Sequence, residues 1–156
     1  MTELSHLRAD GSAHMVDVTD KKVTRREASA QAVLVTTPEV VAKIADGSLP
    51  KGEALGTARL AGIMGAKQTS TLIPLCHPLP LTKLSVDLEP QHDRVRIVAT
   101  AVTNGVTGVE MEALTAASIS ALTLYDMIKA VDKNAVITDV LVLAKSGGKS
   151  GDWSRP

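Results

Sequence analysis

Two short segments of alternating polarity, joined by four residues, constrain the fold of this chain most. Residues 81–89 alternate apolar and polar side chains, and residues 94–103 begin with the same alternation before both faces become apolar. The four residues between them, 90–93, begin with a proline and suit a turn. The pattern predicts a β-hairpin, so the fold must contain an antiparallel sheet.

The segments around the hairpin predict the elements that would complete the sheet. Thr37, Pro38 and Glu39 supply an N-cap, a proline at the first helical position and an early acid. Gly47 suits the end of that helix. In chain order we expect a strand at 30–36, a helix at 37–47, a helix at 51–71, the hairpin, a helix at 109–131 and a strand at 135–144. This βαββαβ order with one additional helix predicts an α+β, ferredoxin-like fold, with helices on one face of an antiparallel sheet.

The core of such a fold must be built from small aliphatic side chains. Only Tyr125 and Trp153 are aromatic, and the chain has no phenylalanine. The segments 51–71 and 109–131 are rich in glycine and alanine, which indicates close approach of their backbones to a neighbouring element or a ligand. Proteins that stack single-stranded nucleic acid on aromatic side chains are nearly excluded.

Length and charge predict a single domain without an overall affinity for polyanions. The chain has 156 residues, of which 44% are hydrophobic, and this is enough for one core. We expect a flexible arm at 1–14, one catalytic domain at 15–144 and a Gly/Lys-rich tail at 145–156. Basic and acidic residues balance at 17 each, so any anion site must be a local cluster.

Cysteine content and hydropathy indicate the compartment. Cys76 is the single cysteine, which excludes an intrachain disulfide and a zinc site with several thiolates. The N-terminus lacks the pattern of a secretory leader, and no apolar run approaches the ~20 residues of a membrane span. We therefore expect a cytoplasmic protein.

The two strands at 94–103 and 135–144 predict assembly. The strand at 94–103 becomes apolar on both faces at VATAV, and the strand at 135–144 is apolar on both faces, whereas the helices would cover only one face of the sheet. Exposed apolar sheet is a liability that contact between subunits removes. We expect a homo-oligomer; the alternative is that the N-terminal arm covers the open face.

The tail contains two lysines among glycines. Its Gly-Lys-Ser sequence resembles part of a phosphate-binding loop, but the glycine spacing is wrong and no helix follows. Lys145 and Lys149 could still bind phosphate together with the bare backbone amides around them. The alternative is a solvated tail.

A loop stiffened by three prolines holds a cysteine and a histidine. Cys76 and His77 lie in the sequence IPLCHPLP, where a rigid backbone suits preorganised binding of a polar group. The histidines elsewhere have no metal-ligand spacing relative to this pair, so we predict no metal site. A nucleophilic cysteine and a merely structural Cys-His pair both remain open.

The predicted helix at 109–131 carries charged residues at both ends. Glu110 and Glu112 flank Met111 in its first turn, where the helix dipole favours carboxylates, so one of them can be a simple cap. Asp126 and Lys129 share a face near its other end, where an acid beside a lysine can tune a proton shuttle or form a surface ion pair. Five lysines lie close to element ends or glycines, and their convergence would make a polyphosphate pocket: Lys51, Lys67, Lys129, Lys145 and Lys149.

Four stretches in order resemble the cyclic pyranopterin monophosphate synthase family, the C proteins of molybdenum cofactor biosynthesis. They read HMVDVTDK, AGIMGAKQTSTLIPLCHPLPL, GVEMEALTAASISALTLYDMIKA and VLAKSGGKSGD, and the resemblance covers about residues 14–152. It implies a ferredoxin-like subunit in a hexamer built as a trimer of dimers, with active sites at the dimer interface. It also implies a lyase that converts the 3′,8-cyclic dihydro derivative of GTP to cyclic pyranopterin monophosphate and releases pyrophosphate.

The resemblance assigns roles to individual residues. Asp126 matches the catalytic aspartate, and Lys129 matches its partner in acid–base chemistry. The matching substrate-binding positions are Leu75, Cys76, His77, Glu110, Met111, Glu112, Lys51, Lys67, Lys145, Lys149 and, from a neighbouring subunit, Arg26. No redox cofactor and no resident metal are implied, although Mg²⁺ could accompany the triphosphate.

Two positions depart from the family pattern. Lys22 stands where proline is common, and Gln68 stands where a basic residue is common, so neither is predicted as a site residue. The competing function is a ferredoxin-like regulatory module that binds a small molecule without turning it over. Release of pyrophosphate from the cyclised GTP derivative separates the two functions.

Overall fold

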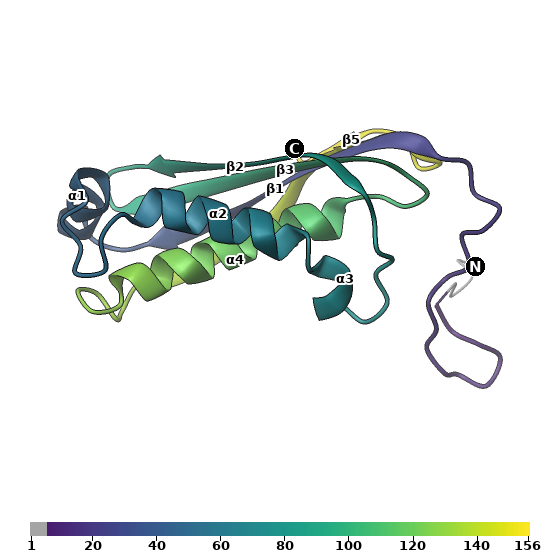
Figure 1. The fold of residues 1–156 in the computed structure, drawn as a ribbon, viewed down its shortest axis with the longest axis horizontal. Coiled ribbons are helices and arrows are strands. Elements are labelled where there is room, and N and C mark those ends of the chain that lie inside the picture. The colour runs from purple at the N-terminus through teal and green to yellow at the C-terminus, as the bar shows by residue number, and fades with distance from the viewer. Residues whose placement is uncertain (1–5) are drawn as a thin grey trace.

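An antiparallel sheet forms one layer of the molecule, and α2 and α4 lie side by side against one of its faces (Figure 1). The computed structural model describes residues 6–156, so the first five residues of the predicted arm lie outside the described residues. The elements are β1 Thr24–Val35, α1 Pro38–Asp46, α2 Ala54–Ala66, α3 Thr69–Leu72, β2 Leu81–Pro90, β3 Arg94–Gly105, α4 Glu110–Ile128, β4 Val136–Ser146 and β5 Trp153–Ser154. No helix in this described part has the length and apolar character needed to cross a membrane.

The sheet has the strand order β2-β3-β1-β4-β5, and every neighbouring pair is antiparallel. The first four strands have the arrangement that a βαββαβ chain produces, with β1 in the centre between β3 and β4. The predicted hairpin is β2–β3, and the predicted cap residues of α1 are confirmed. The Thr37 hydroxyl accepts the Val40 N–H, and Gly47 ends the helix in the left-handed conformation. The α+β ferredoxin-like prediction is therefore confirmed.

The helix predicted at 51–71 is wrong in extent. Gly52 has a positive φ of 87°, so the helix cannot begin there, and Glu53 instead caps α2 by accepting the Gly56 N–H. The chain then turns at Lys67 and Gln68, and α3 follows as a separate short helix. Lys51 accordingly lies in a loop before α2.

The central strand β1 is longer than predicted, and the sheet has an additional edge strand, β5. β1 begins at Thr24, opposite Gly105, although its first residues are polar and charged and show no strand pattern. The tail, which its composition marks as flexible, returns to the sheet edge as β5, where Trp153 pairs with Lys145. The Arg155 guanidinium lies 5.5 Å from the centre of the Trp153 ring, and this stacking adds to the backbone pairing.

Small residues let α2 and α4 approach closely on the helix-covered face. A Cβ at Gly62 would lie 2.8 Å from the Ala116 carbonyl oxygen, and one at Gly65 would lie 2.8 Å from the Ile119 side chain. Beneath them the sheet presents Ala30, Ala32, Ala99 and Ile97, all fully buried. Alanine and glycine thus replace the missing aromatic residues by bringing backbones together.

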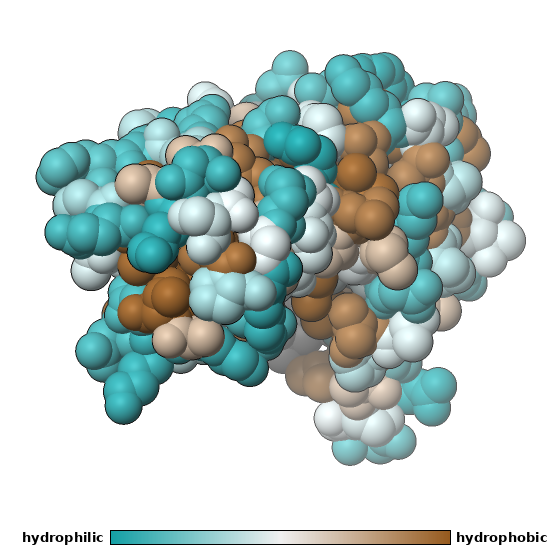
Figure 2. All heavy atoms as spheres, turned by 60° about the vertical axis from the view of Figure 1, so that its left-hand side comes forward, coloured by the Kyte–Doolittle hydropathy of each residue, from teal (hydrophilic) through white to brown (hydrophobic). Residues whose placement is uncertain are grey.

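The opposite face of the sheet is of mixed polarity, which corrects the basis of the assembly argument. Val98 and Leu141 lie on either side of Gln31, and Arg96 lies opposite Val33 in the next row. The strands at 94–103 and 135–144 are therefore apolar on both faces only in part. The helices also expose large apolar side chains. Leu60 and Met64 on α2 and Leu122 on α4 are 55–59% exposed. Figure 2 shows several brown apolar areas open to solvent between the teal ones.

Replacing Gly62 by alanine tests the close approach of α2 to α4. Alanine favours a helix by about 1 kcal/mol over glycine, but the new methyl group would meet backbone, and overpacking of this kind costs about 1–3 kcal/mol. We expect Gly62→Ala to lower the free energy of unfolding in urea. Gly56→Ala is the matched control, because its methyl group would meet only the flexible Glu53 side chain. Equal stability of the two variants would contradict the packing argument.

Candidate functional site

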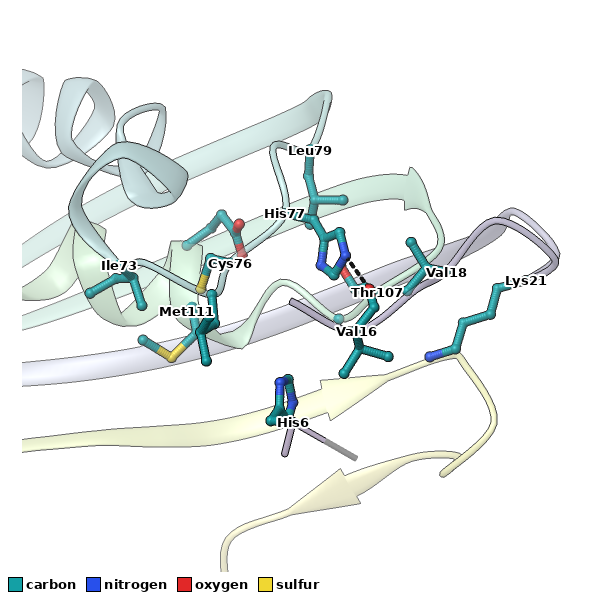
Figure 3. Close-up of a pocket in the computed structure, with 13 residues that line it drawn as sticks. His6, Val16, Val18, Lys21, Ile73, Cys76, His77, Leu79, Thr107 and Met111 are labelled. Atoms are coloured by element: carbon teal, nitrogen blue, oxygen red, sulfur yellow. Dashed lines mark hydrogen bonds between the residues drawn. The ribbon is translucent and has the colours of Figure 1, made fainter. Parts of the chain in front are cut away.

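A cavity of about 510 Å³ lies beside the N-terminal end of α4 (Figure 3). Its walls come from the N-terminal segment, from the proline-rich loop after α3, from the loop before α4 and from the first turn of α4. The structure brings together five predicted substrate-binding residues in these walls: Leu75, Cys76, His77, Met111 and Glu112. Residues distant in sequence thus converge on one small-molecule-sized space.

His77 is oriented by a hydrogen bond to the N-terminal segment. Its Nε2 lies 2.7 Å from the carbonyl oxygen of Val16 (Figure 3). A carbonyl oxygen can only accept, so Nε2 carries the hydrogen and donates it. In the neutral imidazole the lone pair is then on Nδ1, which fixes the tautomer of a residue lining the cavity.

Burial raises the pKa of the acid and of the thiol in the cavity. Glu112 is only 4% exposed, and this desolvation raises the pKa of its carboxyl, with a further contribution from the charge of Glu110. Burial, and then the charge of Glu112, raises the pKa of the Cys76 thiol. A thiol with a raised pKa has less of the nucleophilic thiolate form, so this shift favours a binding or structural role for Cys76.

A smaller, polar cavity of about 180 Å³ adjoins the first, because Gly108 lines both. It contains Arg26, Glu110 and Lys145, with the Lys145 Nζ 3.7 Å from a Glu110 carboxylate oxygen. The Arg26 Nε donates to the Gly105 carbonyl at 3.1 Å, which holds the guanidinium against β3. Arg26, which the resemblance assigns to a neighbouring subunit's site, thus lines the same cavity as Glu110 and Lys145 of its own chain.

The glycine-rich tail is shaped to pass close to the start of β1. Gly147 has a positive φ, and a side chain there would collide with the Arg25 carbonyl oxygen. Its N–H donates to the Asp152 carboxylate at 3.1 Å, which closes the loop. Lys149, at the exposed tip of this loop, lines neither cavity.

The third group of predicted residues lies at the other end of α4. Asp126 forms ion pairs with Lys51 at 2.7 Å and with Lys129 at 2.8 Å. The hydrogen bonds from Lys129 and then Lys51 lower the pKa of Asp126 to about 2, so it is ionised at neutral pH. Fourteen residues of helix separate Asp126 from Glu112, a distance of about 21 Å at 1.5 Å per residue. One chain therefore does not bring the two groups together.

Comparison with known proteins decides the family. Residues 15–148 match the family model described as MoaC family. The chain belongs to the MoaC family. It is 65% identical over 154 residues to the cyclic pyranopterin monophosphate synthase of Corynebacterium efficiens, covering 99% of each chain. The proteins of that name from Corynebacterium glutamicum and Dinoroseobacter shibae are 62% and 58% identical, over 99% and 97% of each chain.

The N-terminal segment of this MoaC-family chain contributes residues that the sequence analysis did not predict. His6, Val16, Val18 and Lys21 all line the larger cavity. Val16, Val18 and Lys21 lie within the stretch HMVDVTDK, which carried the resemblance but shows no helical or strand period. Lys67, in contrast, is exposed at the end of α2 and lines neither cavity. Within residues 6–156 no group of His, Cys, Asp and Glu is suited to hold a metal ion.

The raised pKa of Glu112 predicts a pH-dependent loss of stability. In the unfolded chain this carboxyl has its lower, ordinary pKa, so between the two pKa values the folded chain binds more protons than the unfolded chain. The free energy of unfolding therefore falls as the pH rises from the ordinary pKa through the folded pKa. We expect Glu112→Gln to raise the free energy of unfolding relative to the unmodified chain at about pH 7, with the difference shrinking toward about pH 4. Urea unfolding at the two pH values measures this, and a difference that does not change with pH would contradict it.

Proposed function

We propose that this chain is a cyclic pyranopterin monophosphate synthase and acts as a lyase in molybdenum cofactor biosynthesis. It converts the 3′,8-cyclic dihydro derivative of GTP to cyclic pyranopterin monophosphate and releases pyrophosphate. The observation that carries the proposal is 65% identity over 99% of a curated protein of that name, together with two adjoining cavities lined by the expected residues. We place the activity in the cytoplasm, where a free thiol such as Cys76 is maintained.

The charges around the cavities suit this substrate. A triphosphate brings about four negative charges, which cationic side chains must neutralise in a partly desolvated cleft. Arg26 and Lys145 provide two such cations in the smaller cavity, and the larger one can accept the guanine-derived part between His77 and Glu112 together with the phosphate nearest to it. The reaction needs no redox cofactor in this proposal, and any Mg²⁺ would enter with the triphosphate.

The complete site requires a second copy of the chain. In this proposal the Lys51–Asp126–Lys129 group of one subunit faces the cavities of its partner, within a hexamer built as a trimer of dimers. Two copies of α4 related by a two-fold axis that crosses the helix at the level of residue 119, midway between Glu112 and Asp126, would place opposite helix ends together. The exposed Leu60, Met64 and Leu122 on the outer sides of α2 and α4 are suitable apolar contacts for such a pairing.

Asp126 and Lys129 would perform the proton transfers. The ionised Asp126 is a weak base while both lysines bind it, because their hydrogen bonds stabilise its charge. Substrate phosphates compete for Lys51 and Lys129, and the carboxylate becomes more basic when either lysine turns from it to a phosphate. The same lysines can then stabilise the leaving pyrophosphate, so substrate binding activates the acid–base pair.

Replacing Asp126 by asparagine tests the reaction and the role of the pair. The change keeps size and hydrogen bonding but removes the carboxylate, so pyrophosphate release from the cyclised GTP derivative should fall about 100- to 10,000-fold with little change in substrate affinity. Asp87→Asn, on an exposed position of β2, is the control.

Two outcomes would contradict the proposal in different ways. Near-normal turnover by both Asp126→Asn and Lys129→Ala would reduce the pair to a surface ion pair. Substrate binding without pyrophosphate release by the unmodified protein would instead support the regulatory module. The oligomeric state is measured on the same samples, so that loss of assembly is distinguished from loss of chemistry.

A further inference from the structure

The larger cavity has a wall that the core of the domain does not supply. His6, Val16, Val18 and Lys21 line it from the segment that precedes β1. This segment forms backbone hydrogen bonds between its own residues, for example from the His14 N–H to the His6 carbonyl and from the Lys21 N–H to the Val18 carbonyl. The hydrogen bond from His77 to Val16 joins it to the proline-rich loop across the cavity.

The charge of the cavity depends on this wall. Among the residues that line it, Glu112 is the buried acid on the domain side, and Lys21 is the one side chain with a permanent positive charge. A polyanionic substrate would therefore meet a carboxyl but no ammonium or guanidinium group if the segment were absent. Figure 3 shows the Lys21 amino group directed back toward Val16.

Lys21 also differs from the lysines already assigned to the site. Lys51 and Lys129 pair with Asp126, and Lys145 lies near Glu110. Lys21 forms no ion pair with a carboxylate in the described part of the chain. Its ammonium group is therefore available to an incoming anion without first breaking an ion pair within the protein.

We infer that Lys21 is a further substrate-binding residue, which the N-terminal segment presents to the phosphate groups of the substrate. The inference rests on the proposed function for the identity of the substrate. The hydrogen bond between His77 and the Val16 carbonyl holds the segment five residues before Lys21. This contact therefore helps to position the lysine as well as the imidazole. The segment thereby belongs to the active site.

The test compares Lys21→Ala with Lys22→Ala, two neighbouring exposed lysines of which only Lys21 lines the cavity. Loss of one charge-assisted hydrogen bond, worth about 1.5–3 kcal/mol, weakens binding about 10- to 150-fold. We expect Lys21→Ala to raise the KM for the cyclised GTP derivative in this range with a smaller effect on kcat. Lys21→Arg should restore much of the affinity, and Lys22→Ala should resemble the unmodified protein.

A second measurement does not depend on turnover. Calorimetric titration with inorganic tripolyphosphate should show weaker binding to Lys21→Ala than to Lys22→Ala, and the difference should shrink at high salt because the contact is ionic. Equal KM values and equal tripolyphosphate affinities for the two variants would overturn the assignment of Lys21. If the unmodified protein releases no pyrophosphate, the proposed function fails, while the tripolyphosphate titration still decides whether Lys21 binds phosphate.

Discussion

The packing of α4 against the sheet and α2 fixes the distance between the functional groups at its two ends. Gly62 allows α2 to reach the α4 backbone, Gly65 leaves room for the Ile119 side chain, and alanines fill the contact with β1 and β3. The helix is consequently a rigid rod with Met111 and Glu112 at one end and Asp126 at the other. Since a helix cannot shorten, its 1.5 Å rise per residue keeps these groups about 21 Å apart within one chain. A second copy is the direct way to join them.

The two ends of the rod differ in their electrostatics. At the N-terminal end, burial raises the pKa of Glu112 and of the Cys76 thiol, which favours uncharged forms. At the C-terminal end, two lysines hold Asp126 ionised in an exposed position. A site assembled from both would pair a shaped cavity with a charged acid–base group. In the proposed reaction the cavity would bind the substrate, and Asp126 with Lys129 would transfer the protons.

Local sequence signals predicted much of the fold. Alternation predicted the β2–β3 hairpin, and the Thr37–Pro38 start with Gly47 at the end delimited α1, because capping depends on neighbouring residues alone. The start of β1 was missed because pairing with Gly105, distant in sequence, orders polar residues there. The contacts of the N-terminal segment were missed for the same reason: the segment has no periodicity, and only the three-dimensional position of His77 gives Val16 a partner.

The most direct test of a site shared between two copies is complementation between defective subunits. Arg26→Ala removes a cation from the cavity side, and Asp126→Asn removes the carboxylate from the other side. Co-expression of the two variants in equal amounts, with different tags to purify assemblies that contain both, forms hybrid dimers. Random pairing among the three dimers of the proposed hexamer leaves about one quarter of the sites unmodified, so activity should recover to about a quarter of that of the unmodified protein. Activity no higher than that of either variant alone would contradict a shared site.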